Sequence, residues 1–472
     1  MSDEFSAVVE RVRERVTPDA DERERLRAAT DALVERTTEA VADLPVDADV
    51  LLVGSTARDT WLAGDRDVDL FVRFPPALKR GDLESYGLTV GQEVLPDGRE
   101  EYAEHPYTVG EFEGFTVDLV PCYDVPEATE IQSAVDRTPF HTQYLEARLT
   151  DDRPAEVRVA KAFLKGIGVY GSDLRTEGFS GYLTELLVLE YGGFRPFVAA
   201  AADWHPPVEL DPADHGRKSF DDPVVMIDPT DPERNVAAAL SATNVARLQH
   251  YARDLLADPR AELFEPDAPA PLDDAAVRGA VDERGTTPVA VRFDAPDVVD
   301  DQLWPQLRKS LAGVTDELDR RGFDVLRAAA WADDEGEANG GDESDQRDAA
   351  ATDGADEAVL FAELAVAERP VVERHDGPPV HVREHAEGFY EKYADTEAYG
   401  PFIAGERYVV EREREFTTAR AFLESDALFD VALGTHVEQA LADGYAVLVG
   451  DDVAALADAF GVQLARYFSP KP

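Results

Sequence analysis

One strand–turn–strand segment near the N-terminus limits the possible folds of this chain more than any other stretch. The apolar run DVLLV (49–53) predicts a short buried strand, the small pair Gly54-Ser55 follows it, and residues 56–62 fit a short helix. The segment DVDLFVRF (67–74) then shows the two-residue alternation of a second strand. The N-terminal part of the chain is therefore predicted to be an α/β domain with a tight turn at a strand end.

The second of these strands carries two aspartates on one face. Asp67 and Asp69 are two residues apart, and two neighbouring carboxylates are costly unless a cation lies between them. Carboxylate oxygens favour Mg²⁺ as that cation. Gly54 lets the backbone approach a phosphate, while the Ser55 hydroxyl and the helix N–H groups form an anion site. The pattern predicts a triphosphate at the turn and its metal on the strand.

A third carboxylate completes the pattern. Asp118 lies between apolar neighbours in TVDLVPCYDV (116–125), a further predicted strand that Pro121 is expected to end. An unpaired carboxylate is costly to bury there. In two-metal chemistry, such a carboxylate bridges the ions and deprotonates the attacking hydroxyl. The three aspartates together predict a nucleotide–metal site.

Two other interpretations account for part of the pattern. Asp67 and Asp69 alone fit the half-exposed strand of an acid-rich protein equally well, and only the turn and the third aspartate favour the site. The spacing Asp65-x-Asp67-x-Asp69 also resembles the start of a calcium-binding loop. However, Leu70 stands where that loop needs glycine and Pro76 where it needs glutamate, which excludes an EF-hand.

The charge of the chain indicates its environment. Against 46 lysine and arginine residues stand 98 aspartates and glutamates, scattered from end to end, for a formal charge of −52 over 472 residues. Lysine is nearly absent. This composition suits molar salt, where a Debye length of about 3 Å removes most self-repulsion, and predicts a halophile. One cysteine, Cys122, a charged N-terminus and the lack of long apolar runs predict a cytoplasmic protein without membrane association.

Patterns along the first half of the chain predict two domains. The first, residues 1–145, is the α/β catalytic domain, and its N-terminal helices are split at Thr17-Pro18. The second, residues 146–265, is dominated by helical patterns. The Pro/Asp/Ala-rich stretch 264–276 is predicted to be a linker.

Two more domains are predicted beyond the linker. Residues 280–372 show a strand, helix, strand, strand order that suits a ferredoxin-like sandwich. Within it, the acidic segment 332–357 is too poor in large apolar residues to fold and is predicted to be a disordered loop. Residues 375–472 form a last α/β domain.

These features resemble the polymerase-β-like nucleotidyltransferase superfamily, in which a Gly-Ser pair is followed about ten residues later by two acids one residue apart, and later by a third. From about residue 40 almost to the C-terminus, the chain is similar to the archaeal, class I CCA-adding enzymes. The segments that carry this resemblance are VGSTARDTWLAGDRDVDLFVRFP, PFHTQYLEARL, RVAKAFLKGIGVYGSDLRTEGFSGYLTELL, DPTDPERNVAAAL, HVREHAEGFYEKY and GPFIAGERYVVER.

The resemblance implies an N-terminal polymerase-β-like domain, a helical central domain, and ferredoxin-like and α/β C-terminal domains that bind RNA. It implies template-independent addition and repair of the tRNA 3′-terminal CCA from CTP and ATP, with two Mg²⁺ ions and release of pyrophosphate. The partner is tRNA, bound at its acceptor stem, 3′ end and elbow, and the family suggests a homodimer.

The resemblance also assigns site residues. Asp67, Asp69 and Asp118 are the expected magnesium ligands, with Asp118 placed to activate the tRNA 3′-hydroxyl; many relatives have glutamate in place of Asp67. The expected ATP and CTP contacts are Gly54, Ser55, Arg58, His141, Lys161, Tyr170 and Arg234. Of these, Ser55 and Arg58 match triphosphate-binding positions, and Arg234 matches the arginine that contacts the incoming base and RNA phosphates.

Local patterns leave alternatives for several of these contacts. Lys161 is retained in a lysine-poor chain, which suggests a phosphate partner, but it also fits a snorkelling surface residue. His141 alone fits a hydrogen-bonded structural histidine, Tyr170 fits simple packing, and Arg234 fits a surface ion pair.

Two further motifs are not interpreted as sites. GIGVYG (166–171) matches a dinucleotide fingerprint but follows a helix instead of a strand, so Gly166 is expected to cap that helix. HVREH (381–385) matches an inverted zinc-protease pattern, but it follows Pro378-Pro379 in a region that resembles an RNA-binding tail.

A strongly acidic chain should repel RNA, so a local basic stripe is expected in the C-terminal part. Its candidates are Arg374, Arg383, Lys392, Arg407, Arg412 and Arg414. Arg412 and Arg414 alternate with glutamates in EREREF and should share one face of a strand. Two rival functions are a poly(A) polymerase with the same first domain and a non-catalytic RNA-binding protein, which the three intact aspartates argue against.

Overall fold

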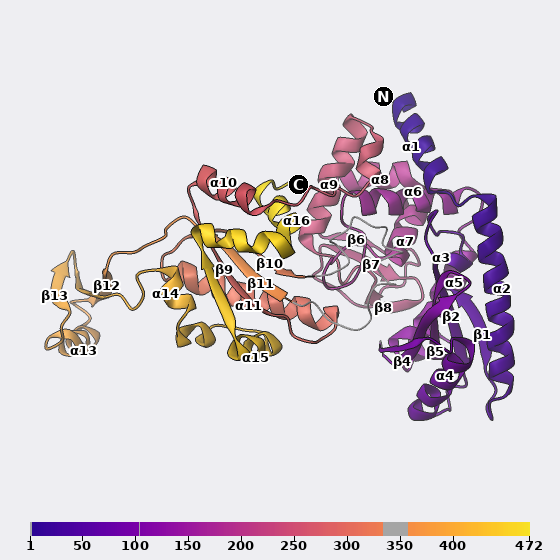
Figure 1. Cartoon of the computed structure of the whole chain (residues 1–472), viewed down its shortest axis with the longest axis horizontal. Coiled ribbons are helices and arrows are strands. Elements are labelled where there is room, and N and C mark those ends of the chain that lie inside the picture. The colour runs from indigo at the N-terminus through magenta and orange to yellow at the C-terminus, as the bar shows by residue number, and fades with distance from the viewer. Residues whose placement is uncertain (1, 103, 334–356) are drawn as a thin grey trace. The chain divides into compact units, whose positions relative to one another are not determined.

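The computed structural model describes residues 2–102, 104–333 and 357–472 of the chain (Figure 1). Of the acidic segment 332–357, predicted to be a disordered loop, residues 334–356 lie outside the described part. None of the described helices is long and apolar enough to cross a membrane.

The chain divides into two compact units, the first ending at Asp267 and the second beginning at Ala268. This boundary falls inside the stretch 264–276 predicted as a linker. The last residues of that stretch, however, already belong to helix α10 (Asp274–Arg284), whose N-cap Asp273 accepts a hydrogen bond from the backbone N–H of Ala276. An aspartate cap before an Asp/Ala-rich segment is a helix start signal, and the linker prediction is wrong there.

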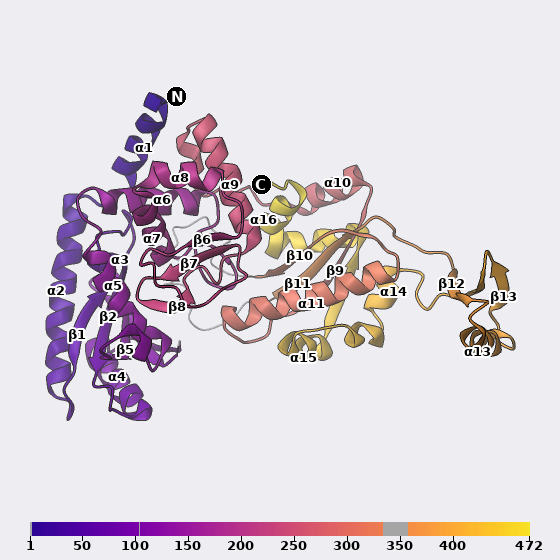
Figure 2. The same ribbon diagram turned by 180° about the vertical axis from the view of Figure 1, so that it is seen from behind.

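The first unit is built around a five-stranded sheet in the order β1-β2-β5-β4-β3. Strands β2 and β5 are parallel, and the other pairs are antiparallel. In both views helix α2 runs along the sheet beside β1 (Figures 1 and 2). The elements of this part are α1 (Ser2–Val16), α2 (Ala20–Ala42), β1 (Asp49–Val53), α3 (Gly54–Ala57), β2 (Asp67–Phe74), α4 (Arg80–Val94), β3 (Arg99–Tyr102), β4 (Pro106–Phe112) and β5 (Phe115–Tyr123).

Strand β5 continues through Pro121 to Tyr123, so the expected end of the strand at Pro121 is wrong. The pairing with β4 reaches only to Leu119, whereas the pairing with β2 continues to Tyr123. Proline is tolerated in a strand where its missing N–H would face no partner strand, and Pro121 lies beyond the paired part of β4.

The short helix after β1 is also shifted from its predicted place at residues 56–62. It begins at Gly54, and Asp59, with φ of +53°, has the left-handed backbone conformation that a right-handed helix cannot contain. The segment that follows is therefore a loop, and it places Thr60 in the interior of the unit.

A second group of elements in the first unit is mainly helical, as predicted, but it includes a small sheet β6-β7-β8 that the sequence pattern did not indicate. Its elements are η1 (Ala128–Glu130), η2 (Ala134–Arg137), α5 (Thr138–Glu146), α6 (Arg153–Gly166), α7 (Gly181–Tyr191), α8 (Phe194–Ala202), β6 (Val208–Leu210), β7 (Val224–Asp228), β8 (Asp231–Asn235), α9 (Ala242–Ala257) and η3 (Ala261–Phe264).

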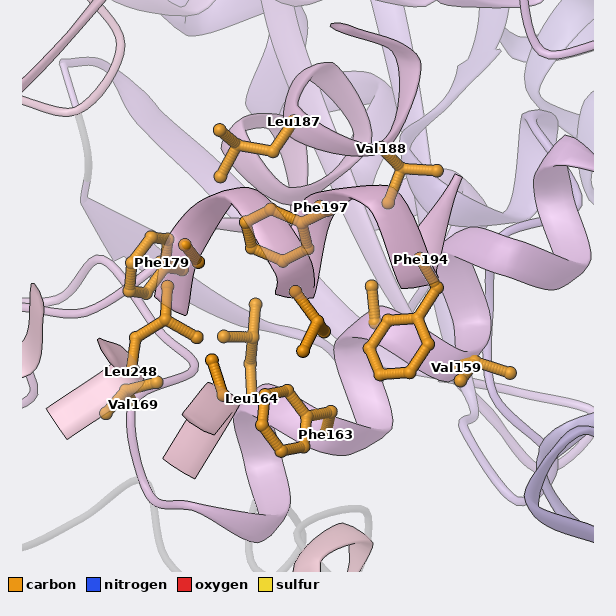
Figure 3. Packing of buried hydrophobic residues seen from close by; sticks show 14 of the residues in the cluster. Val159, Phe163, Leu164, Val169, Phe179, Leu187, Val188, Phe194, Phe197 and Leu248 are labelled. Carbon is orange, nitrogen blue, oxygen red and sulfur yellow. The ribbon is translucent and has the colours of Figure 1, made fainter. Parts of the chain in front are cut away.

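The helices pack around a core rich in phenylalanine (Figure 3). The rings of Phe163 and Phe194 meet edge to face with centroids 5.7 Å apart. Phe5 and Val8 of α1 are buried in the same core, so α1 packs with the helical group although it precedes the sheet in sequence.

Gly166 ends α6 but does not have the left-handed conformation of a cap, which Gly168 adopts with φ of +69°. A Cβ at Gly166 would lie 2.4 Å from the carbonyl oxygen of Leu263. Close approach of two backbone segments therefore explains this glycine, and its expected role as a cap is wrong.

The second unit has a four-stranded antiparallel sheet in the order β10-β11-β9-β15 and a three-stranded sheet in the order β12-β14-β13. The fourth strand of the larger sheet, β15, comes from beyond the predicted range 280–372. Besides α10, the elements are β9 (Thr287–Asp294), α11 (Asp300–Arg320), β10 (Val325–Ala332), β11 (Glu357–Leu364), β12 (Val372–Pro379), α13 (Arg383–Tyr393), β13 (Tyr399–Ala404), β14 (Arg407–Glu413), α14 (Ala419–Leu423), η5 (Asp426–Asp430), α15 (Thr435–Asp443), β15 (Tyr445–Val449), η6 (Gly450–Leu456) and α16 (Ala457–Phe468).

Candidate active site

The sheet of the first unit brings the three predicted aspartates together. Asp69 on β2 and Asp118 on β5 are direct neighbours in the parallel pairing of these strands. Asp67 precedes Asp69 by two residues and lies on the same face of β2. All three are partly exposed, and Asp69 and Asp118 each lie between two buried apolar neighbours. The arrangement places three carboxylates on one surface of the sheet centre.

The Gly54 turn packs directly on this surface. Gly54 has φ of +72°, and a Cβ added to it would lie 1.8 Å from Oδ2 of Asp69. The hydroxyl of Thr56 in α3 donates a hydrogen bond to the backbone carbonyl of Asp67, at 2.8 Å. The turn and the carboxylates are therefore in contact, and Ser55 lies between the two residues that make these contacts.

Oxygen donors of this kind are those that Mg²⁺ prefers. Among the described residues, no group of three or more His, Cys, Asp or Glu side chains is already arranged to hold a metal ion. Asp67, Asp69 and Asp118 as a magnesium site therefore stay a prediction. The donor chemistry and the cradle without a Cβ at Gly54 fit it.

A buried carboxylate holds two of the predicted nucleotide contacts. Glu185 of α7 is fully buried and accepts hydrogen bonds from Nε of Arg58, at 3.1 Å, and from the hydroxyl of Thr60. Nζ of Lys161 lies 3.7 Å from Glu185 and donates to the carbonyl oxygen of Thr60 at 3.0 Å. Arg58 also donates to Oγ1 of Thr142 at 3.2 Å. We refer to Arg58, Thr60, Lys161 and Glu185 as the Glu185 cluster.

The Glu185 cluster excludes one of the two interpretations of Lys161, that of a snorkelling surface residue, and its phosphate partner stays a prediction. The side chain of Lys161 is only 5% exposed, so Lys161 is not a snorkelling surface residue. Burial lowers the pKa of Lys161, and the Glu185 carboxylate opposes that shift. Tyr170 lies nearby, because a Cβ at Gly181 would be 3.1 Å from the Tyr170 hydroxyl and 3.9 Å from Lys161 Nζ.

A second buried carboxylate contacts two more of the seven predicted nucleotide contacts, His141 and Arg234. Asp228, the last residue of β7, is fully buried, and its Oδ2 lies 2.9 Å from Nε2 of His141 and 2.8 Å from Nη1 of Arg234. Its Oδ1 accepts hydrogen bonds from the backbone N–H and the hydroxyl of Thr230 and from the hydroxyl of Tyr182. The rings of His141 and Tyr182 stack with centroids 3.9 Å apart. We call these five residues the Asp228 cluster.

The protonation of the Asp228 cluster follows from these contacts. Burial favours the neutral acid, but the hydrogen bonds from His141 and Thr230 outweigh it and hold the pKa of Asp228 well below its usual value. Burial lowers the pKa of His141, against the pull of the Asp228 carboxylate. Burial, with the neighbouring carboxylate, also raises the pKa of Tyr182 far above its usual range. These directions favour an ionised Asp228 and a neutral His141 at neutral pH.

His141, Tyr182 and Arg234 line a cleft of about 1000 Å³. Arg137, Arg217 and Lys218 also line it, together with the acidic Asp231 and Glu233, so cationic residues outnumber acidic ones in the lining of this otherwise acidic protein. Of the predicted site residues in the described part of the chain, the cleft lining contains His141 and Arg234, but neither the aspartates nor Lys161 and Tyr170.

The sequence analysis missed Glu185, Asp228 and Tyr182. Glu185 and Tyr182 stand in GYLTELLVLEY, whose apolar pattern predicts only a buried helix, and Asp228 ends the apolar strand VVMID. The available signal was a single charged residue inside an otherwise buried apolar run, where a carboxylate requires partners.

The predicted basic stripe of the second unit is largely neutralised. Arg412 and Arg414 both contact Glu373, at 2.8 and 3.2 Å, which confirms that they share a side. Arg374 pairs with Asp376 at 2.8 Å. Likewise, Arg383 pairs with Glu387. These carboxylates reduce the positive potential that the stripe was expected to have. Two other candidates make different contacts, since Lys392 lies over the ring of Tyr393 and Arg407 donates to the carbonyl oxygen of Gly377.

The sheet, the turn and the three aspartates define the class of a nucleotidyltransferase. A family model described as a nucleotidyltransferase domain matches residues 34–141. Models described as the second domain of tRNA nucleotidyltransferase and as the C-terminal domain of CCA-adding enzyme match residues 155–265 and residues 284–338 and 345–450, respectively.

Curated relatives define the family more closely. A CCA-adding enzyme from Haloarcula marismortui is 67% identical over 473 residues, with 100% of both chains covered, and one from Halorubrum lacusprofundi is 64% identical with the same coverage. One from Methanoregula boonei is 43% identical over 89% of this chain and 87% of its own. The chain therefore belongs to the CCA-adding enzymes, a family of tRNA nucleotidyltransferases, and the resemblance noted from its motifs is confirmed.

Solved structures are more distant. The Cid1 poly(U) polymerase bound to MgATP is 16% identical, with a TM-score of 0.44, over 56% of this chain and 99% of that chain. This similarity is too low to support a statement about this chain.

Proposed function

We propose that this protein adds and repairs the 3′-terminal CCA of tRNA, without a template, from CTP and ATP. The observation that carries the proposal is the placement of Asp69 beside Asp118 on parallel strands, with Asp67 on the same face and the Gly54 turn packed against Asp69. Membership of the CCA-adding family supports the choice of tRNA as the substrate.

Nucleotidyltransferases of this superfamily generally use divalent metal ions, and we propose Mg²⁺ for this chain. Asp67, Asp69 and Asp118 would hold it; when bound, it stabilises the negative charge that develops on the triphosphate and on the departing pyrophosphate. A carboxylate oxygen of Asp118 accepts the proton of the tRNA 3′-hydroxyl as that hydroxyl attacks the α-phosphate. The bond to the α-phosphate forms as the bond to pyrophosphate breaks.

The nucleotide contacts fall into two groups in this proposal. Gly54 and Ser55 bind the triphosphate at the turn, with Arg58 held ready by Glu185. Lys161 and Tyr170 contact the nucleotide on this same side. On the side of the Asp228 cluster, His141 and Arg234 line the cleft and contact the nucleoside.

The role of the second unit in this proposal is to bind tRNA. We propose that β9, α11, β10, β11, α15 and β15 form a ferredoxin-like module, because they occur in β-α-β-β-α-β order and their four strands form one antiparallel sheet; the elements from β12 to η5 are inserted between β11 and α15. This module and the small β12-β14-β13 sheet would grip the acceptor stem and elbow by shape and phosphate contacts. The four predicted domains, a homodimer and a cytoplasmic location in a halophile complete the proposal.

The test is an incorporation assay in molar KCl with Mg²⁺. Transfer RNAs that end before, within or after CCA are incubated with radiolabelled CTP or ATP, and the new 3′ ends are sequenced. We expect addition that stops at CCA and is abolished by Asp118→Ala. The matched control is Asp124→Ala, which removes an exposed carboxylate just after β5 that pairs with Arg73. An open-ended A tail would instead identify a poly(A) polymerase, and no incorporation would favour a non-catalytic RNA-binding protein.

A further inference from the structure

We propose that Asp228 is a positioning residue that fixes the His141 ring in one tautomer, with Nδ1 unprotonated, so that this ring accepts a hydrogen bond from the nucleotide in the cleft. The inference rests on the proposed function, since it concerns the nucleotide of that same reaction. It assigns a role to a buried carboxylate other than the three predicted metal-binding aspartates.

The hydrogen-bond inventory of Asp228 fixes which atoms are donors. Five donor groups surround its two oxygens: Nε2 of His141 and Nη1 of Arg234 at Oδ2, and the N–H and hydroxyl of Thr230 and the hydroxyl of Tyr182 at Oδ1. An ionised carboxylate can only accept. Every group that contacts it must therefore present a hydrogen, and this includes the ring nitrogen Nε2 of His141.

A neutral imidazole carries one N–H. Because Nε2 of His141 must carry it, Nδ1 has a free lone pair and acts as an acceptor. The ring cannot turn easily to exchange these atoms, since it stacks on Tyr182 with an interplanar angle of 15°, and Tyr182 is itself tied to Asp228. The cleft wall therefore offers a fixed acceptor at His141 beside the donor groups of Arg234.

The matching group on the nucleotide is a hydrogen-bond donor. CTP and ATP share three such groups, the exocyclic amino group of the base and the ribose 2′- and 3′-hydroxyls. UTP lacks the amino group, 2′-deoxy-CTP lacks the 2′-hydroxyl, and 3′-deoxy-CTP lacks the 3′-hydroxyl. These three analogues separate the three sources of the same chemistry.

Replacing Asp228 with asparagine exchanges the hydrogen-bond donor and acceptor atoms of the His141 ring. Asparagine has one oxygen and one NH₂ group. The backbone N–H of Thr230 cannot accept, so the oxygen stays on its side and the NH₂ group faces His141 and Arg234. His141 must then accept at Nε2 and carry its hydrogen at Nδ1, which is the wrong tautomer for a substrate donor. Arg234 loses its anchor in the same step.

The kinetic test compares kcat/KM for CTP, UTP, 2′-deoxy-CTP and 3′-deoxy-CTP, each in a single addition, in the wild type and in Asp228→Asn. A site that is built to accept a hydrogen bond from its substrate rejects the analogue that lacks this donor by a large factor, on the order of 10⁴–10⁵. We expect kcat/KM for CTP to fall about 100-fold in Asp228→Asn. The preference for CTP over one analogue should collapse to within about threefold, and the analogue concerned identifies the donor.

The matched control is Asp211→Asn. Asp211 also lies in the first unit and is exposed. Its carboxylate accepts a hydrogen bond from the backbone N–H of Gly216, and it does not line the cleft. It should retain the wild-type preference. A preference that survives unchanged in Asp228→Asn, while the wild type adds CCA, would overturn the inference and leave the proposed function intact.

A second measurement does not require the variant to fold. Nitrogen-15 shifts of the histidine rings in the wild-type protein report the tautomer, and the His141 signals are assigned by their loss in His141→Gln. We expect a protonated Nε2 and an unprotonated Nδ1 at pH 7.5. The opposite tautomer, or a doubly protonated ring, would refute the inference whether or not the protein has the proposed activity.

Discussion

Replacing Gly54 with alanine tests the contact on which the catalytic face depends. The new Cβ would lie 1.8 Å from Oδ2 of Asp69, whereas ordinary van der Waals contact begins at 3.4 Å. The difference, 3.4 − 1.8, means that the carboxylate must move by about 1.6 Å. In addition, a left-handed φ of +72° costs a non-glycine residue roughly 1–2 kcal/mol.

A displacement of this size is large for a reacting centre, since a misplacement of about 1 Å can cost about 100-fold in rate. We therefore expect Gly54→Ala to lose at least about 100-fold in kcat for CTP addition. The free energy of unfolding should fall by about 1–2 kcal/mol, or more where the clash is not relieved. Steady-state incorporation in molar KCl and urea unfolding give the two quantities.

The matched control is Gly285→Ala in the second unit. Gly285 has a similar left-handed φ of +62°, and a Cβ there would meet nothing within 4 Å. It should show the same cost of the left-handed conformation, about 1–2 kcal/mol, with wild-type kcat. The reasoning is refuted if Gly54→Ala retains a kcat within threefold of that of Gly285→Ala.

Three further substitutions probe other parts of the molecule. Glu185→Gln should lower the free energy of unfolding by about 3–5 kcal/mol, because two buried cations lose their counter-charge, whereas Glu190→Gln on the exposed side of the same helix should change it little. His105 is buried, both its ring nitrogens lack hydrogen-bond partners in the described structure, and burial, with nearby Arg80, lowers its pKa. As pH falls, His105 therefore takes up its proton at a higher pH in the unfolded chain than in the folded protein, so the free energy of unfolding should fall as pH drops below about 6.5. In His105→Phe, thermal melting should show a weaker dependence over that range. Lys392→Ala should weaken tRNA binding and reduce the salt slope by about 0.7–0.9. The effect of Arg383→Ala should be smaller, because its guanidinium already pairs with a glutamate; equal effects would contradict the assignment.

The sheet face that carries Asp67 and Asp69 beside the Gly54-Ser55 turn could be predicted, because the residues that define it are close together in the sequence. Gly54-Ser55 follows its strand directly, and the two-residue spacing of Asp67 and Asp69 fixes their common face wherever that strand lies. The partner Asp118 required one further assumption, that its strand pairs beside β2, and the parallel register confirms it.

The buried carboxylates could not be predicted in the same way. Glu185 contacts Arg58 across 127 residues of sequence, and Asp228 contacts His141 across 87. No local pattern specifies such pairs, since each forms only after helices and strands have packed. The same limit explains the fourth strand of the second unit's larger sheet, because β15 pairs with β9 over more than a hundred residues of intervening chain.

The two buried carboxylates also bear on how a site for an anionic substrate works in a chain of charge −52. Exposed pairs such as Arg374 with Asp376 are screened in molar salt and contribute little. Pairs inside the protein are screened much less, so the contacts of Glu185 with Arg58 and Lys161, and that of Asp228 with the partly exposed Arg234, depend less on ionic strength than the exposed pairs do. Each carboxylate also cancels part of the positive charge that it holds. Long-range attraction is therefore weak, and binding of the triphosphate and the base must depend on the fixed directions of a few donors and acceptors. Because α7 contributes both Glu185 and, one turn earlier, Tyr182, a single helix sets these directions for both clusters.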